Sequence, residues 1–341
     1  MSEAVRASFR DQAKHCRGMD APLMALVLEI LAEALTTGAV ADRVLGWHGD
    51  PAPTADALSL RLAAGLHALV LSGADADLAA AYTAGSEPAL RASLTAALTR
   101  HEAHLLHWLD SPPQTNEVRR SAGLIAAGHW LAQRYGLPMV LSELGASAGL
   151  NLIWDNYALE IAGQPYGLAN SPVLLTPEWQ GQMPPLCPPV ISARAGVDLN
   201  PLDPSADRLR LLSYLWAGQD DRLTRTKAAA DLAAGFPGMV TGGDAVDWLE
   251  TRLATPYPGH LHLVFHTIAW QYFPPATQAR GAALLAQAGA RATADAPLAH
   301  LAMEADATPG SAALTLTLWP GGQTIPLGRA GFHGQWIHWL G

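Results

Sequence analysis

Apolar residues in the first 136 positions recur at steps of three and four, which is the spacing of one helix face. In residues 22–34 these apolar positions are Leu23, Leu26, Val27, Ile30, Leu31 and Ala34. Comparable stretches at 56–71, 88–109 and 116–136 are separated by turn-forming clusters such as TAGSEP and DSPPQT. The pattern predicts an all-helical N-terminal domain, residues 1–136.

From residue 137 to residue 341 the pattern changes to short β-rich runs that alternate with helical segments. Strands are expected at 138–144, 188–198, 238–242, 260–267 and 296–305. A proline-rich stretch, 165–189, is expected to have little regular structure, and the runs 313–322 and 334–340 are expected to form an antiparallel pair. The alternation predicts an α/β domain with a mostly parallel, doubly wound sheet.

Acidic residues stand at three successive strand ends of this domain: Glu143, Asp198 and Asp244. Ligands of doubly wound sheets bind at the carboxyl ends of the strands. A carboxylate there can accept hydrogen bonds from hydroxyl or amine groups. The three acids therefore predict one shared binding crevice.

The stretch ELGASAGLN, residues 143–151, fits two kinds of chemistry. Its G-x-S-x-G pattern is that of a hydrolase elbow, with Ser147 as nucleophile, Asp244 or Asp247 as the acid and His333 as the base. Such an elbow normally follows several strands, whereas here only helices precede the first one. The alternative is a glycine turn that approaches a nucleotide-like cofactor.

The order of these motifs resembles class I S-adenosylmethionine-dependent methyltransferases, which have a Rossmann-like, seven-stranded sheet with an antiparallel final strand. ELGASAG resembles their acidic-x-Gly-x-Gly-x-Gly loop, with Ser147 in place of the middle glycine. The resemblance implies that Asp198 in GVDLNP holds the ribose and that Asp244 in GGDAVDW contacts the adenine. The residues implied to bind the cofactor are Glu143, Gly145, Ala146, Ser147, Gly149, Asp198, Asp244 and Ala245.

LVFHTIAWQYF resembles the fourth strand and the following loop, where these enzymes position the methyl acceptor. This implies that Trp270 and Gln271 lie at the acceptor and that His266 and Tyr272 have catalytic roles. His333 in FHGQW is a further candidate base, because histidine titrates near neutral pH. Each histidine has a plainer interpretation as a hydrogen-bonded structural residue.

QTNEVRR places Asn116, Glu117 and Arg120 just before the first strand. These side chains either reach over the cofactor pocket as substrate ligands or form a helix cap with a surface ion pair, and the sequence leaves both open. As a cap, Thr115 or Asn116 is expected at the N-terminus of the following helix.

At a finer level the whole chain resembles an uncharacterised bacterial family, domain of unknown function 2332. The phrases that carry this resemblance are QTNEVRRSA, ELGASAGLNL, GVDLNPLD, LLSYLW, HTIAWQYF and FHGQWIHW. The family implies no activity, but it implies that the helical part belongs with the sheet domain.

The histidines of HEAHLLHW, at 101, 104 and 107, are one residue short of the H-E-x-x-H zinc helix, and a solvated face is expected rather than a metal site. The formal net charge of −9 argues against a nucleic-acid partner. Cys16 and Cys187 are expected to be free thiols in a reducing cytoplasm. No apolar signal or membrane-spanning segment is evident, and the oligomeric state is left open.

The sequence thus predicts a cytoplasmic S-adenosylmethionine-dependent methyltransferase that acts on a small molecule. A serine hydrolase that uses Ser147 is the first alternative. A nucleotide-binding protein of the same fold without catalysis is the second.

Overall fold

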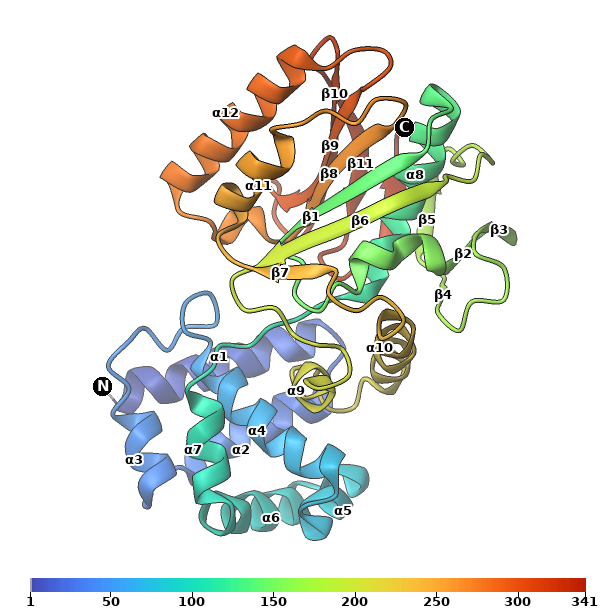
Figure 1. Ribbon diagram of the computed structural model, residues 1–341. Helices are drawn as coiled ribbons and strands as arrows, with labels where there is room; N and C mark the ends of the chain where they lie inside the picture. Colours follow the sequence, from blue (N-terminus) through green and yellow to red (C-terminus); the bar gives the residue numbers. More distant parts are fainter. Residues whose placement is uncertain (1) are drawn as a thin grey trace. The chain divides into compact units, whose positions relative to one another are not determined.

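The computed structural model describes residues 2–341, which form two compact units (Figure 1). Unit 1 comprises the chain up to Thr115 together with Ala206–Thr224, and unit 2 comprises Asn116–Ser205 and Arg225–Gly341. In residues 2–341 no single helix is long and apolar enough to cross a membrane. Two bent helix pairs, Pro22–Ala34 with Ala39–Leu45 and Leu58–Ser72 with Ala76–Ala84, meet those limits only in combination.

Unit 1 is helical, as the periodicity predicts. Its helices are α1 (Ser2–Gly18), α2 (Pro22–Ala34), α3 (Ala39–Leu45), α4 (Leu58–Ser72), α5 (Ala76–Ala84), α6 (Glu87–Arg100), α7 (Glu102–Leu109) and α9 (Arg208–Ser213). The stretch 88–109 is two helices, because His101 leaves helical geometry with φ −116° and ψ 32°. From the predicted stripe of α2, Val27, Ile30 and Leu31 are fully buried.

The boundary between the units differs from the predicted division at residue 136. The segment 206–224 packs into unit 1, where the Leu215 carbonyl lies 2.9 Å from Nδ1 of His67 and Ala217 belongs to the same apolar core. Helix α8 (Ser121–Tyr135) belongs to unit 2, since Gly128 packs against Trp154 and Pro189. Helix α10 (Asp220–Ala233) begins in one unit and ends in the other.

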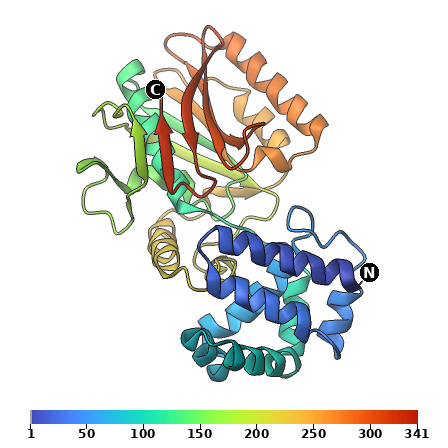
Figure 2. The same ribbon diagram turned by 180° about the vertical axis from the view of Figure 1, so that it is seen from behind.

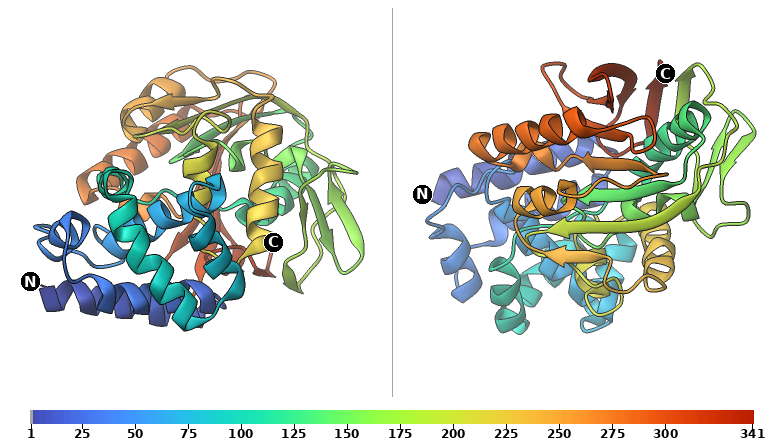
Figure 3. Two further views of the ribbon diagram at one scale, coloured as in Figure 1. Left: turned by 90° about the horizontal axis from the view of Figure 1, so that it is seen from below. Right: turned by 45° about the horizontal axis from the view of Figure 1, so that its top comes forward.

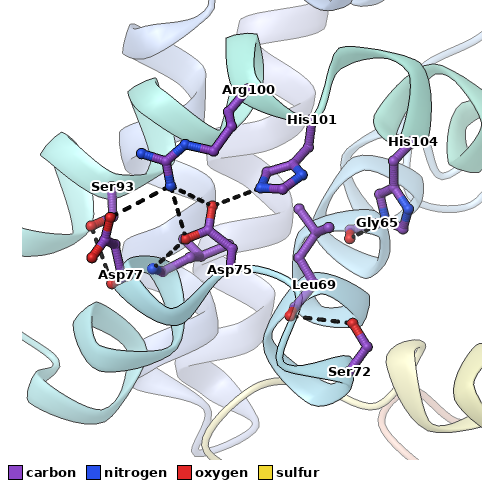
Figure 4. A network of polar contacts seen from close by, with 10 residues as sticks. Gly65, Leu69, Ser72, Asp75, Asp77, Ser93, Arg100, His101 and His104 are labelled. Atoms are coloured by element: carbon purple, nitrogen blue, oxygen red, sulfur yellow. Dashed lines mark hydrogen bonds and ion pairs between the residues drawn. The ribbon is translucent and has the colours of Figure 1, made fainter.

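His101, at the junction of α6 and α7, and His104, in α7, have separate partners (Figure 4). His101 lies 2.9 Å from the carboxylate of Asp75, which also caps α5 by accepting the Leu78 amide at 3.0 Å. His104 faces the Gly65 carbonyl at 2.9 Å. These two side chains therefore join helices and do not converge on a common point.

Unit 2 is built on a nine-stranded sheet in the order β5-β12-β11-β10-β9-β8-β1-β6-β7 (Figures 1 and 2). The parallel strands are β7 (Val240–Gly242), β6 (Ile191–Asp198), β1 (Met139–Leu144), β8 (Leu261–Thr267) and β9 (Leu298–Ala305). An antiparallel meander follows through β10 (Ala312–Trp319), β11 (Gln323–Ala330) and β12 (Trp336–Trp339), with β5 (Glu178–Gly181) parallel to β12 at the edge. The sheet is mostly parallel, and it has two strands more than the seven expected.

Helices cover both faces of the sheet (Figure 3). Helices α11 (Ala245–Leu253) and α12 (Pro275–Arg291) bury one face, through an apolar cluster that contains Leu249, Val264 and Leu285. Helix α8 lies on the other face, where Gly123 approaches Leu314. This double cover explains why β1 and β8, inside the parallel half, are buried along their whole length, as a doubly wound sheet requires.

Two predictions were wrong, one about the stretch 165–189 and one about the pairing of the C-terminal strands. The stretch 165–189 contains short strands: β3 (Gln164–Gly167) and β4 (Leu174–Leu175) pair with β2 (Ala158–Ile161), and β5 joins the large sheet. The C-terminal runs do not pair directly, because β11 lies between them. Its sequence, QTIPLGRA, hides the strand signal: the β10–β11 register shifts beside Pro326 and Gly328, which weaken strand patterning.

Candidate functional site

The turn after β1 is held in a tight, left-handed conformation. Gly145, Ser147 and Gly149 have φ of 70°, 52° and 72°. The amides of Gly145 and Ala146 both donate to the Val197 carbonyl, at 2.9 and 3.0 Å. Ser147, which stands where the middle glycine is missing, adopts a positive φ itself, a conformation that costs a non-glycine residue free energy. The turn is thereby fixed against the end of β6.

Asp198 and Asp244 each organise a loop at the carboxyl ends of the strands. Asp198 accepts the Ser147 amide at 2.8 Å on one oxygen and the Asn200 amide at 2.9 Å on the other. Asp244 caps α11, whose first residue is Ala245, by accepting the Val246 and Asp247 amides at 2.8 and 3.0 Å. A carboxylate can accept about four hydrogen bonds, so these contacts do not use the full accepting capacity of either group.

Glu143, the last acid of β1, is buried with an incomplete hydrogen-bond set. Its side chain lies in the core at 1% relative exposure, and its Oε2 has no hydrogen-bond partner among residues 2–341. Burial raises the pKa of Glu143 well above its usual value; the nearby Asp198 raises it further, and Arg120 opposes both. The carboxyl group therefore favours its neutral form.

The Oγ of Ser147 is a second buried oxygen without a hydrogen-bond partner in residues 2–341. Most buried polar atoms in folded proteins are paired, so two unpaired oxygens on one short segment require an explanation. A bound ligand with hydrogen-bonding groups is one such explanation. The candidate site is therefore centred on Glu143 and Ser147.

The part of QTNEVRR that belongs to unit 2, residues 116–120, lies at this same edge. Arg120 donates from Nε to the Phe332 carbonyl at 2.9 Å and from its guanidinium to the Thr267 carbonyl at 3.0 Å. The Leu150 amide donates to Asn116 at 2.8 Å, which ties Asn116 to the end of the glycine turn. The three predicted substrate ligands, Asn116, Glu117 and Arg120, are all buried.

Neither Thr115 nor Asn116 caps α8. A 3₁₀ turn, Val118–Arg120, precedes the helix, and Glu117 caps that turn by accepting the Arg119 amide at 3.2 Å. Glu117 also faces Nδ1 of His333 at 3.4 Å. The side-chain oxygen of Asn116 therefore accepts a hydrogen bond from Leu150, 34 residues away, instead of capping the following helix. A sequence pattern does not reveal such a long-range contact.

His266, which is buried, forms a hydrogen-bonded chain with two partly buried residues that were not among the predicted site residues. Its Nδ1 lies 2.7 Å from Glu304, and its Nε2 lies 2.9 Å from Nε2 of His300. Both ring nitrogens of His266 thus have protein partners, so neither is available for direct contact with an acceptor. A signal for Glu304 was present: like the three selected acids, it stands near the end of a predicted strand.

The predicted acceptor residues lie on a short 3₁₀ turn, Trp270–Tyr272, that follows β8. The Trp270 ring stacks on His266 with ring centroids 5.0 Å apart. Gln271 is exposed, and Tyr272 has 70% relative exposure. Trp270 is therefore the anchored member of this group, and Gln271 and Tyr272 are open to solvent.

The residues of the hydrolase triad are not joined by hydrogen bonds. Within residues 2–341 the Ser147 hydroxyl has no partner, Asp244 caps α11, and Asp247 pairs with Arg280. His333 pairs with Glu117 instead of a serine. The nucleophile in this arrangement lacks the general base that a serine hydrolase uses.

Replacing Glu143 by glutamine tests the neutral state of this group. Because the folded-state pKa of Glu143 is raised, its contribution to stability is present below pH 4.5, the unfolded value, and is lost as the pH rises. Glutamine does not titrate, so Glu143→Gln lacks this loss. The melting temperature of Glu143→Gln minus that of the wild type should therefore increase between pH 4.5 and pH 8. A melting-temperature difference that is constant over this range would contradict the assignment.

The fold and the site define a class: a mixed α/β protein with a large, mostly parallel sheet and a polar cluster at the strand ends. Residues 6–339 match the family model described as an uncharacterized protein conserved in bacteria, DUF2332. The chain belongs to this family. No protein with a curated description and no solved structure matches the chain.

Proposed function

We propose that the carboxyl edge of the unit 2 sheet binds S-adenosylmethionine and that the protein methylates a small molecule. The observation that carries the proposal is the buried carboxyl group of Glu143, near the end of β1, the middle strand of the parallel half. Its Oε2 has no hydrogen-bond partner among residues 2–341. Strand order reverses at this point, because β6 and β7 continue to one side of β1 and β8 and β9 to the other. Doubly wound sheets bind ligands at such a reversal.

The residues around Glu143 fit a cofactor with ribose and amine groups. Gly145, Ala146, Ser147 and Gly149 form the turn; Asp198 would accept from the ribose; Asp244 and Ala245, at the start of α11, would lie by the adenine. Unpaired oxygens on Glu143 and Ser147 support this fit. The bound cofactor would supply a methyl group activated by a sulfonium, so the protein's main task would be to align the acceptor.

The acceptor side would be formed by the Trp270–Tyr272 turn with Asn116, Glu117 and Arg120. Of the three candidate catalytic residues, His333 and Tyr272 remain partly or largely exposed, whereas His266 is enclosed by Glu304 and His300. A base is needed only if the acceptor must lose a proton. The net charge of −9 favours a small molecule over a nucleic acid as acceptor.

The sheet agrees with the methyltransferase resemblance in its parallel half and departs from it in its antiparallel half. The order β7-β6-β1-β8-β9 is the doubly wound order of five consecutive parallel strands. Beyond β9 the chain forms a simple meander, and β5 adds an edge strand. The proposal therefore rests on the parallel half, which carries every proposed cofactor ligand.

One observation favours the serine hydrolase as a second candidate. Ser147 has the positive φ, 52°, of a residue on a strained turn, and its buried hydroxyl has no hydrogen-bond partner in the described part of the chain, residues 2–341. Labelling by a fluorophosphonate that disappears in Ser147→Ala would support this candidate over the methyltransferase. Binding of S-adenosylmethionine without turnover across a broad panel of acceptors would instead support a non-catalytic binding protein.

Calorimetric titration with S-adenosylmethionine and S-adenosylhomocysteine tests the main proposal. We expect both to bind the wild type, and Asp198→Asn to weaken binding by about tenfold or more, since a charge-assisted hydrogen bond contributes about 1.5–3 kcal/mol. Glu160→Gln, an exposed acid on β2, serves as the matched control and should bind like the wild type. Absence of binding to the wild type, or equal binding by Asp198→Asn, would refute the proposal.

A further inference from the structure

The turn that follows β8 is strained at its first residue. Ile268 has φ 52°, which is unfavourable for a β-branched side chain. Its amide donates to the Met303 carbonyl at 2.8 Å. The same turn carries Trp270, Gln271 and Tyr272, so whatever holds it in place also sets the position of these three side chains.

Backbone amides of this turn converge on the carboxylate of Glu304. Oε1 accepts the Ala269 amide at 2.9 Å and the Trp270 amide at 3.1 Å, while the Gln271 amide lies 3.4 Å from Oε2. Successive amides that point to one place form an anion-binding concavity. Here the anion is a side chain of the protein itself, supplied from the end of β9.

His266 completes the environment of this carboxylate. Burial alone would raise the pKa of Glu304, but the hydrogen bond and charge of His266, with the Ala269 and Trp270 amides, outweigh it, and the pKa is lowered. Because Glu304 is ionised, Nδ1 of His266 must carry the proton that it shares. The imidazole is thus fixed in orientation, and Trp270 stacks on it at an interplanar angle of 17°.

We propose that Glu304 is the positioning residue of the 268–272 turn: its carboxylate gathers the turn's amides and locks His266, and so places Trp270 at the acceptor side. The assignment rests on the proposed function in so far as it makes this turn the acceptor loop. Glu304 acts through the turn and through His266, and it has no direct part in methyl transfer.

Chemical rescue tests the proposal. In Glu304→Ala the amides of Ala269 and Trp270 lose the carboxylate that accepts their hydrogen bonds. The 268–272 turn should then open more often, and chymotrypsin should cut after the exposed Tyr272 about tenfold faster than in the wild type. Formate can refill the concavity and should slow this cleavage, whereas chloride at equal ionic strength should not. Asp306→Ala, which removes an exposed carboxylate paired with Arg329, is the matched control and should show no formate effect.

Two results would overturn the assignment: cleavage after Tyr272 at the wild-type rate, or equal acceleration after the buried residues Tyr157 and Tyr166 with no formate effect, which indicates general unfolding. If Glu304→Ala does not fold, Glu304→Gln replaces it, because glutamine keeps the shape of the side chain. A smaller acceleration of cleavage, confined to the bond after Tyr272, is then expected. Cleavage of Glu304→Gln at the wild-type rate would also contradict the proposal. S-adenosylmethionine binding is measured in parallel. If the wild type does not bind S-adenosylmethionine, the proposed function is refuted but the role of Glu304 is not. The formate result alone decides whether Glu304 positions the turn.

Discussion

Gly145→Ala should destabilise the protein and abolish the proposed binding of S-adenosylmethionine. An added Cβ would lie 2.6 Å from the Cβ of Ala269, and the backbone at Gly145 has φ 70°. A positive φ costs an L-residue about 1–2 kcal/mol, and forced overpacking typically costs about 1–3 kcal/mol. Ala269 cannot easily move away, because its amide is bound to Glu304. We therefore expect a loss of about 2–5 kcal/mol in the free energy of unfolding.

Two further variants separate the steric part of this loss from the backbone part. Gly163 has φ 79° with no atom within 4 Å of an added Cβ, so Gly163→Ala should cost only the backbone part. Ala269→Gly removes the clashing methyl and should recover part of the loss when combined with Gly145→Ala. Denaturant unfolding measures all four proteins. Equal losses in Gly145→Ala and Gly163→Ala would show that close packing at the turn is unimportant.

Acid should destabilise unit 2 through two histidines, the buried His262 and the partly buried His300. Burial lowers the pKa of each to about 3, with Arg252 adding to the effect at His262 and His266 at His300. Their folded-state values lie below the unfolded value of 6.5, so the stability they contribute is present above pH 6.5 and is lost as the pH falls toward 3. Each histidine should lower the free energy of unfolding by on the order of 1 kcal/mol per pH unit in this window.

Glutamine variants isolate these two residues from other titrating groups. Nε2 of His262 pairs with the Ser142 hydroxyl at 2.8 Å, and Nε2 of His300 pairs with His266, and the glutamine amide nitrogen can occupy either position. The loss of stability of His262→Gln/His300→Gln between pH 6.5 and 4.5 should be smaller than that of the wild type. Glu143 opposes the wild-type trend, so the difference between the proteins is the informative quantity.

Calorimetric melting at several pH values provides the measurement. His338→Gln, which replaces an exposed histidine on β12, is the control and should leave the profile as in the wild type. Parallel profiles for the double variant and the wild type would show that His262 and His300 do not stay neutral in the folded protein.

The parallel strands were predictable because each one carries its signal locally. β1 and β8 are mostly apolar runs followed by a turn, β6 ends at Asp198 before a turn, and the predicted ranges contain the observed ones. β11 was missed for the opposite reason. Pro326 and Gly328 interrupt its pattern, and only the pairing with β10 and β12 makes this segment a strand.

The candidate site shows the same limit. Glu143 and Asp198 stand in recognisable motifs, so their positions at strand ends could be anticipated. The chain of Glu304, His266 and His300 depends on residues 34 and 38 positions apart, and no local pattern encodes such a contact. Arg120 likewise reaches carbonyls 147 and 212 residues away, so its buried role could not be distinguished from a surface ion pair.

The discontinuity of unit 1 has a consequence for biosynthesis. Its core includes Ala217, which leaves the ribosome about a hundred residues after Thr115. The N-terminal helices therefore cannot complete their packing while only they have emerged. The nascent protein must keep part of an apolar surface open until β1 and β6 have been translated, which couples the maturation of the helical unit to that of the sheet.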